Sequence, residues 1–347
     1  MTNTENNSRD ILPQHEPLKP LKSTVVHGID FRALYEHGML PEFEALFSHF
    51  IEALDSLSED NLKDRATKLA SECQMLHPSR PSGLRGFEFG AFFMHFWTFC
   101  HLIARCIPHG HIGQKLLVQV FVDLDAAGQS TNEDWKGLPG LGMFTREDWI
   151  SPTFARVKSD EEVYTLQQWL NFNSFVARHS GTGFPRGLNF AVWEIRHGLE
   201  EPLQERPTKD SRQAVGFEIS HDVEQLLDEP RDDVDKRAES QPLPLGPEGT
   251  HRVAVAAEWL IHAPSVLLRA ALSWGSRPLL DDLERRVFCT GSLFDGNPGL
   301  DLERWGFWKR RLNGLRGRLG NDEETRHSVD AAVASMSAAE CSAAQHL

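Results

Sequence analysis

The sequence has few cysteines, no long apolar run and no excess of basic residues, and each shortage excludes a class of protein. Its 347 residues include five cysteines, an odd number, with no CxxC pair, so neither a disulfide framework nor a zinc ribbon is indicated. No apolar run reaches the roughly 18–20 residues of a membrane-spanning helix. Lysine and arginine number 36 against 50 acidic residues, a net charge of −14, which argues against a nucleic-acid partner.

The sequence patterns of common cofactor and catalytic sites are also missing. There is no Walker, GxSxG or HExxH pattern, and the glycine-rich run at 137–142 lacks the strand and lysine of a phosphate-binding loop. His109 and His111 have no third ligand at metal spacing, so we expect no metal and no cofactor. The polar N-terminus lacks the apolar core of a secretory signal. Together with the unpaired cysteines, this predicts a cytoplasmic location and no membrane partner.

Apolar residues recur at three- and four-residue steps through most of the chain, the spacing of amphipathic helices. The most apolar segment, 83–107, predicts a central helix that is buried on most sides. We expect further helices at about 112–126, 160–180, 187–200, 249–274 and 302–319, and a long connection at 128–159. Strand alternation is scarce, so the predicted fold class is all-α, an irregular multi-helix bundle in a single domain.

Composition shifts mark polar additions to this domain. Residues 1–27 are polar and contain three prolines, which predicts a disordered N-terminal segment. The helical domain is expected at 28–320, interrupted by an insertion at 201–247 that holds six of the nineteen prolines. Twelve acidic residues face six basic ones between 201 and 242, so we predict a mobile, acidic insertion. Residues 321–347 are expected to form a C-terminal helix or tail.

Four segments occur in an order that is typical of one protein family. They read FWTFCHLIARCIPHGHIGQKLLVQVFVDL, then WLNFNSFVARHSGTGF with FAVWEIRHGLE, then VAVAAEWLIHAP, and finally LDLERWGFWKRRL. Over roughly residues 30–320 this set resembles the large fungal family catalogued as domain of unknown function 3632. The resemblance implies a helical protein of about this size, and some members lie in secondary-metabolite gene clusters. It implies no catalytic residue set, and this chain departs from the pattern near Pro264 and in its insertion.

One face of the central helix carries candidate chemistry. Trp97, His101 and Arg105 follow one another at four-residue steps, which places them on one side of a helix. Polar side chains in so apolar a helix need partners. In a functional site His101 would act as acid or base, and Arg105 would hold a carboxylate or enolate of a small substrate. The structural alternative is a satisfied core histidine and an arginine that pairs with Glu194 or Glu258.

Two acids and a basic aromatic segment complete the candidates. Glu194 and Glu258 are the candidate acid–base partners of His101, and the alternative for each is a surface or inter-helix pair. Arg304 and Trp305 are candidate substrate-binding residues, and the alternative is an amphipathic helix in which Arg304 forms a buried ion pair. A cavity lined by Trp97, His101 and Trp305 would favour small-molecule binding over the structural alternatives.

The sequence is compatible with three functions. The first is an accessory protein of a fungal secondary-metabolite pathway that binds a small-molecule intermediate or a partner enzyme between helices. The second is a cofactor-free tailoring enzyme, an isomerase, cyclase or hydrolase, that uses a histidine–carboxylate pair. The third is a helical adaptor that binds proteins through its acidic insertion.

Overall fold

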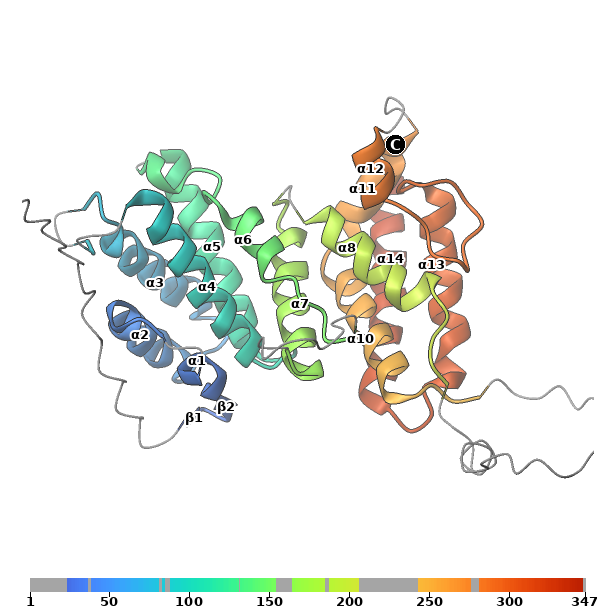
Figure 1. Ribbon diagram of the computed structural model, residues 1–347, viewed down its shortest axis with the longest axis horizontal. Helices are drawn as coiled ribbons and strands as arrows, with labels where there is room; N and C mark the ends of the chain where they lie inside the picture. The colour runs from blue at the N-terminus through green and yellow to red at the C-terminus, as the bar shows by residue number, and fades with distance from the viewer. Residues whose placement is uncertain are drawn as a thin grey trace, which may run out of the picture.

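The computed structural model describes residues 24–36, 39–80, 83–84, 88–130, 132–153, 164–184, 187–205, 243–275 and 281–345. Across these ranges the regular structure is helical apart from a two-stranded antiparallel hairpin, β1 (Val25–Val26) with β2 (Ile29–Asp30). The predicted all-α class is therefore confirmed. The helices form two groups, one at each end of the long axis, with a single helix between them (Figure 1).

The N-terminal group is built around the apolar segment that the sequence singles out. Its elements are α1 (Arg32–Glu36), the 3-10 turn η1 (Pro41–Phe43), α2 (Glu44–Leu54), α3 (Leu62–Leu76), α4 (Phe89–Cys106) and α5 (Ile112–Ser130). Helix α4 buries twelve of its residues, as expected of a helix that is apolar around most of its circumference. The predicted helix at 112–126 is confirmed as α5, which packs on α3 and α7.

The C-terminal group surrounds α10 (Pro247–His262), which packs against most of its neighbours. The other elements are α8 (Leu188–Ile195), the π-helical turn η3 (Arg196–Glu200), α11 (Pro264–Trp274), α12 (Asp282–Val287), α13 (Leu302–Leu315), the 3-10 turn η4 (Arg316–Arg318) and α14 (Glu323–Ala344). Pro264 ends α10, because proline cannot donate the next helical hydrogen bond, and α11 leaves at an angle of 82°.

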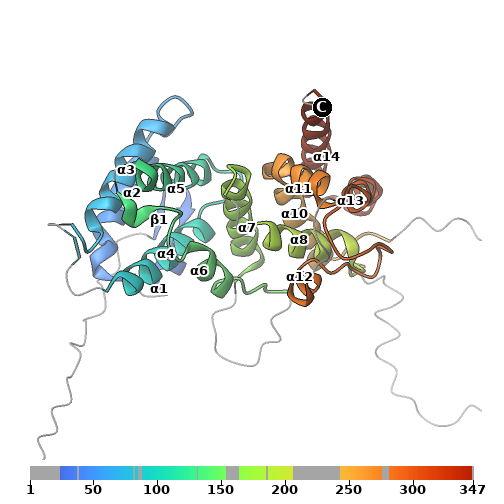
Figure 2. The same cartoon turned by 90° about the horizontal axis from the view of Figure 1, so that it is seen from above.

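Helix α7 (Leu166–Gly181) joins the two groups. It begins at a capping box, in which Thr165 accepts from the Gln168 amide and Gln168 accepts from the Thr165 amide. It packs against α4 and α5 on one side and against α10 on the other. Both views show it between the groups (Figures 1 and 2). The core continues across it, since Phe172 and Phe175 are fully buried on this helix.

The predicted connection at 128–159 is only partly correct. It contains a 3-10 turn, η2 (Glu133–Trp135), and a short helix, α6 (Leu141–Glu147). The many glycines interrupt the apolar spacing, so the sequence pattern did not indicate this helix. Gly140 precedes its first turn with a φ of 77°, a backbone conformation that favours glycine. Residues 154–163 of this stretch lie outside the described residues.

The structure corrects the predicted boundaries of the insertion and of both ends. Residues 201–205 and 243–247 belong to the fold, because Glu205 and Leu245 pair in an isolated β-bridge and Leu245 is 2% exposed. The predicted mobility of the insertion falls on residues 206–242, which lie outside the described residues. Residues 24–27 enter the hairpin, and the predicted N-terminal disorder falls on 1–23, also outside them.

The C-terminal segment is an integral helix. Helix α14 buries Val329, Ala332, Met336 and Ala339 at three- and four-residue steps, and it packs along α10 and α13. The small alanine side chains let the helix axes approach closely, so the domain extends beyond residue 320. Of the described helices, no single one is long and apolar enough to cross a membrane; only α10 and α11 taken together, with their sharp bend, meet that length and composition.

Candidate functional site

Trp97 is part of the core of the N-terminal group. Its side chain is fully buried, and its indole nitrogen donates to the carbonyl oxygen of Pro139 at 2.7 Å. Its ring packs against Phe93, Phe96 and Trp135 at centroid distances of 4.8 to 6.1 Å. The indole therefore has its polar atom and its faces occupied by protein.

His101 has a carboxylate partner that the sequence did not reveal. Its Nδ1 lies 2.5 Å from Oδ2 of Asp148, and its Nε2 lies 3.4 Å from the Thr145 hydroxyl. Both partners come from α6 and the residue that ends it, whereas Glu194 and Glu258 were the expected acids. His101 is 2% exposed, and its ring packs edge-on against Phe172. The relevant acid was missed because α6 was read as part of a connection.

Arg105, the third residue on this face of α4, is buried as well. Its guanidinium carbon lies 5.3 Å from the ring centroid of Tyr164, a cation–π contact. Its backbone carbonyl accepts from the Asn171 side chain at 2.9 Å, which ties the end of α4 to α7. Trp97, His101 and Arg105 thus share one face of α4, as expected, and that face is buried against other parts of the protein.

Glu194 is a buried carboxyl group on α8. The indole nitrogen of Trp149 donates to its Oε1 at 3.1 Å. Burial raises the pKa of Glu194 to about 7, against the opposing effects of the Trp149 and Trp169 hydrogen bonds and of the Arg196 and Arg252 charges. Trp149 follows Asp148 directly in the chain. Asp148 contacts His101 and Trp149 contacts Glu194, so these two neighbours connect His101 with Glu194.

Glu258 belongs to a different cluster, on α10. Its Oε2 lies 3.3 Å from Nε2 of His262, one helical turn away. Burial alone would raise the pKa of Glu258, but the hydrogen bond and charge of His262, with Ser174 and His109, lower it overall. Glu258 therefore lies against a histidine of its own helix, and burial lowers the pKa of that histidine.

Arg304 is a structural residue, which corrects its prediction as a substrate-binding one. All five of its N–H groups have protein acceptors: both carboxylate oxygens of Glu200, at 2.7 and 3.0 Å, and the carbonyls of Phe288, Cys289 and Gly299. Its side chain and that of Glu200 are fully buried. No donor of Arg304 is left for a ligand, so the buried ion pair that was the alternative is confirmed.

Trp305 connects two helices. Its indole nitrogen donates to Oε1 of Glu340 on α14 at 2.8 Å, and Lys309 pairs with the other oxygen of Glu340 at 2.6 Å. Trp305 and Trp97 lie in different helix groups, separated by α7 and α10. The structure therefore does not bring Trp97, His101 and Trp305 together around one cavity.

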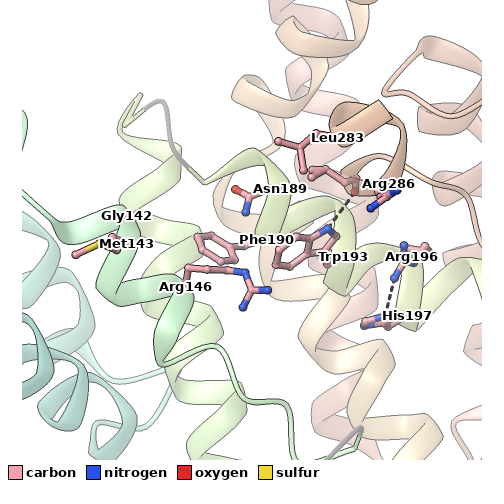
Figure 3. Close-up of a pocket in the computed structure, with 11 residues that line it drawn as sticks. Gly142, Met143, Arg146, Asn189, Phe190, Trp193, Arg196, His197, Leu283 and Arg286 are labelled. Carbon is pink, nitrogen blue, oxygen red and sulfur yellow. Dashed lines mark hydrogen bonds between the residues drawn. The ribbon is translucent and has the colours of Figure 1, made fainter. Parts of the chain in front are cut away.

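The structure instead has an open cleft where the two helix groups meet beside α7. Its volume is about 770 Å³, within the usual range for small-molecule sites. Arg146 of α6 forms one wall, Phe190 and Trp193 of α8 form the floor, and Arg286 of α12 stands opposite (Figure 3). Arg196 of η3 closes one end.

The cleft has a positive lining. None of the described residues that line it is acidic, and three are arginines. The Arg196 Nε lies 3.3 Å from Glu201, which balances its charge, and Arg196 also donates to the Cys289 sulfur. Burial, with the charges of Arg196 and Arg252, lowers the pKa of His197 to about 3, so this lining histidine is neutral at pH 7.

Sequence reasoning missed this cleft for a physical reason. Arg146, Trp193 and Arg286 come from three short helices that are far apart in the chain. The only local signal was the dense, aromatic FAVWEIRHGLE segment, which carries the floor and one end. Among the residues that the structure describes, no group of three or more histidine, cysteine or acidic side chains is placed to hold a metal ion.

A small chamber lies behind the floor of the cleft. It has room for about one water molecule, with a volume near 20 Å³, and shares Gly142 and Phe190 with the cleft. Thr145 and His179 line it. The Thr145 hydroxyl thus lies between this chamber and His101, so the His101–Asp148 pair is close to the cleft but is separated from it by side chains.

The chain was compared with protein families, curated proteins and solved structures. No curated protein and no solved structure matches it. A family model described as "Protein of unknown function (DUF3632)" matches residues 97–312, from the middle of α4 to α13. The match spans every helix that lines the cleft, and it covers more than half of the chain. The protein belongs to the DUF3632 family.

Proposed function

We propose that this protein is an accessory protein of a fungal secondary-metabolite pathway that binds a small-molecule intermediate in the cleft between α6, α8 and α12. The observation that carries the proposal is the cleft itself. Its volume of about 770 Å³ suits a small molecule, and its floor is formed by two aromatic side chains. The pathway assignment rests on the resemblance of this chain to family members that lie in metabolite gene clusters.

The way the cleft is built supports binding. The Trp193 indole nitrogen donates to the Val287 carbonyl at 3.0 Å, which fixes the ring and ties α8 to the end of α12. Behind the cleft, the Phe190 ring packs at a tilt against Trp149, at a centroid distance of 4.3 Å. A floor that is fixed before the ligand arrives loses little conformational entropy on binding.

Deletion of the gene in a producing host, with metabolite profiling, tests the pathway role. We expect the end product to fall or an intermediate to accumulate, and we expect wild-type protein to restore the profile. A Trp193→Ala version should restore it poorly, because the floor of the cleft is lost. Leu272→Ala, an exposed leucine on α11, is the matched control. An unchanged profile in the deletion strain would contradict the proposal.

The second candidate is a cofactor-free tailoring enzyme, and the His101–Asp148 pair is the observation that favours it. A carboxylate 2.5 Å from Nδ1 orients an imidazole so that Nε2 can exchange a proton, and here Nε2 faces Thr145. If a pathway intermediate is converted by the purified protein, His101→Gln should abolish the conversion while substrate still binds. Conversion that survives this change would leave His101 a structural residue.

A further inference from the structure

Two arginines of the cleft, which no described acidic residue compensates, indicate the class of ligand; this step rests on the proposed function. Arg146 and Arg286 line the cleft from opposite sides, and both are exposed. Among the described residues, neither guanidinium group takes part in an ion pair or a hydrogen bond. Arg196, by contrast, is balanced by Glu201 at 3.3 Å. In the part of the chain that the structure describes, the cleft thus presents two guanidinium groups that no carboxylate contacts.

Arg146 is held in position although no acidic side chain of the described ranges pairs with it. Its guanidinium carbon lies 5.2 Å from the ring centroid of Trp193, a cation–π contact. Such a contact uses the face of the guanidinium and leaves its N–H edge available to donate. Figure 3 shows Arg146, Arg196 and Arg286 arranged around the Trp193 indole. An anion that reaches this indole would meet donors from more than one side.

The rest of the lining is apolar and partly open to solvent. Leu283 is 70% exposed and Met143 is 55% exposed, on opposite rims of the cleft. Phe190 and Trp193 form the floor between them. Covering apolar surface removes it from water, which is favourable, so a ligand with a flat hydrocarbon body would gain from contact with both rims and the floor.

We infer that the cleft binds an organic anion: a small molecule with a flat, apolar, preferably aromatic body and one carboxylate or similar acidic group. The apolar body lies on Phe190 and Trp193, between Met143 and Leu283. The acidic group accepts hydrogen bonds from Arg146 and Arg286, whose planar donors match a carboxylate in geometry. A neutral molecule with the same body would leave both guanidinium groups without an acceptor.

Titration of the full-length protein with 1-naphthoate and with 1-naphthalenemethanol tests this inference, because the two probes share a ring system and differ in charge. We expect naphthoate to bind at least about tenfold more tightly, since hydrogen bonds to charged groups each contribute roughly a factor of ten or more. Raising the salt concentration should weaken the binding of naphthoate and leave that of the alcohol unchanged.

Paired variants locate the effect. Arg146→Gln with Arg286→Gln should reduce naphthoate affinity to that of the neutral alcohol, with the circular dichroism and thermal midpoint of the wild type. Arg269→Gln, an exposed arginine on α11 outside the cleft, is the matched control and should bind as wild type does. Equal binding of both probes, unaffected by the arginine changes, overturns the anion inference but keeps a binding cleft. Failure of both probes to bind wild-type protein overturns the inference together with the cleft proposal.

Discussion

At the scale of single residues, the Arg304–Glu200 ion pair has a high desolvation cost, because both of its charges are fully buried. Two opposite charges are fully buried, and their cost is offset only because every donor of Arg304 is used and Glu200 also accepts from Trp308 and from the Gly291 amide. The pair joins η3, α13 and the 288–299 loop. It therefore supports two segments next to the cleft, the η3 turn and the end of α12.

Replacing Arg304 should be strongly destabilising. We expect Arg304→Ala to lower the free energy of unfolding by about 3–5 kcal/mol, because it leaves the Glu200 carboxylate buried without its counter-charge. Urea unfolding followed by circular dichroism measures the loss. Arg310→Ala, an exposed arginine of the same helix, should change stability by less than about 0.5 kcal/mol. If Arg304→Ala does not fold, Arg304→Lys, which cannot make five hydrogen bonds, should show an intermediate loss. A wild-type midpoint in both would contradict the assigned role.

Glu194 predicts a pH dependence with a definite sign. Its pKa of about 7 in the folded protein lies above the ordinary value of 4.5, so the folded state holds this proton more tightly than the unfolded state does. The contribution of Glu194 to stability is therefore full below pH 4.5 and is lost as the pH rises to about 7. The difference corresponds to about 3 kcal/mol as an upper bound.

Glu194→Gln should remove this dependence. Compared with wild type, the variant should gain stability between pH 4.5 and pH 8, by up to about 3 kcal/mol, measured as the difference of urea unfolding curves. Taking the difference cancels the buried histidines, such as His179, whose lowered pKa of about 4 acts in the opposite direction. Glu147→Gln, an exposed acid of α6, is the control. A constant difference across this range would show that Glu194 ionises normally.

At the scale of elements, the π-helical turn η3 is held against α10 by a glycine. A side chain at Gly198 would place its Cβ 2.5 Å from the Arg252 carbonyl oxygen and 2.7 Å from the Ala256 Cβ, both too close. Only glycine lets the two helices approach so nearly. This contact matters for the cleft, because Arg196 and His197 precede Gly198 in the same turn.

Gly198→Ala should therefore separate η3 from α10 and lower stability by about 1–3 kcal/mol, the usual range for overpacking. The end of the cleft should shift with it, so naphthoate binding should weaken as well. Gly314→Ala is the matched change, since a Cβ there meets nothing within 4 Å and the position lies at the C-terminal end of α13. We expect it to stabilise the protein by about 0.4–1 kcal/mol, because alanine restricts the unfolded chain more than glycine does. Thermal unfolding compares the two, and equal midpoints would argue against close packing at Gly198.

The sequence predicted the long apolar helices correctly and missed a short one. Helices α4 and α5 were found because the apolar spacing that buries them is local and repeated over several turns. Helix α6 was missed because it is short and surrounded by glycines, and Asp148, the partner of His101, was lost with it. The Arg304 ion pair was foreseen because an arginine beside Trp305 in an amphipathic helix needs a partner. Its acid, Glu200, lies 104 residues away, a distance that no local pattern spans.

At the scale of the whole molecule, α7 joins the two helix groups through two asparagines. The Asn171 side chain donates to the Arg105 carbonyl and accepts from the His109 amide in the N-terminal group. The Asn173 side chain accepts from the Trp259 indole of α10 at 3.0 Å. Both asparagines are buried, so their hydrogen bonds fix the orientation of each group on α7.

This arrangement predicts that the two groups unfold together. Asn173→Ala should lower stability by about 1–3 kcal/mol, because the Trp259 N–H is left buried without an acceptor. Hydrogen exchange should rise equally in α4 and in α13, although the Asn173 side chain bonds to α7 and α10 and not to α4. Asn313→Ala, an exposed asparagine, should leave exchange unchanged. Faster exchange confined to the C-terminal group would show two independent units.

The sequence by itself determined the all-α class, the main helices and the family, because these depend on local periodicity and on the order of segments along the chain. Only the tertiary structure decided which polar residues meet: Asp148 with His101, Glu200 with Arg304, and the arginines of α6 and α12 around Trp193. The reason is physical. The apolar face of a helix is determined by residues three and four positions apart in the sequence. A cleft or an ion pair depends instead on how helices that are distant in the sequence pack together. The net charge of −14 gave no sign of the arginine-lined cleft. Net charge is a sum over the whole molecule, whereas binding depends on where individual charges lie.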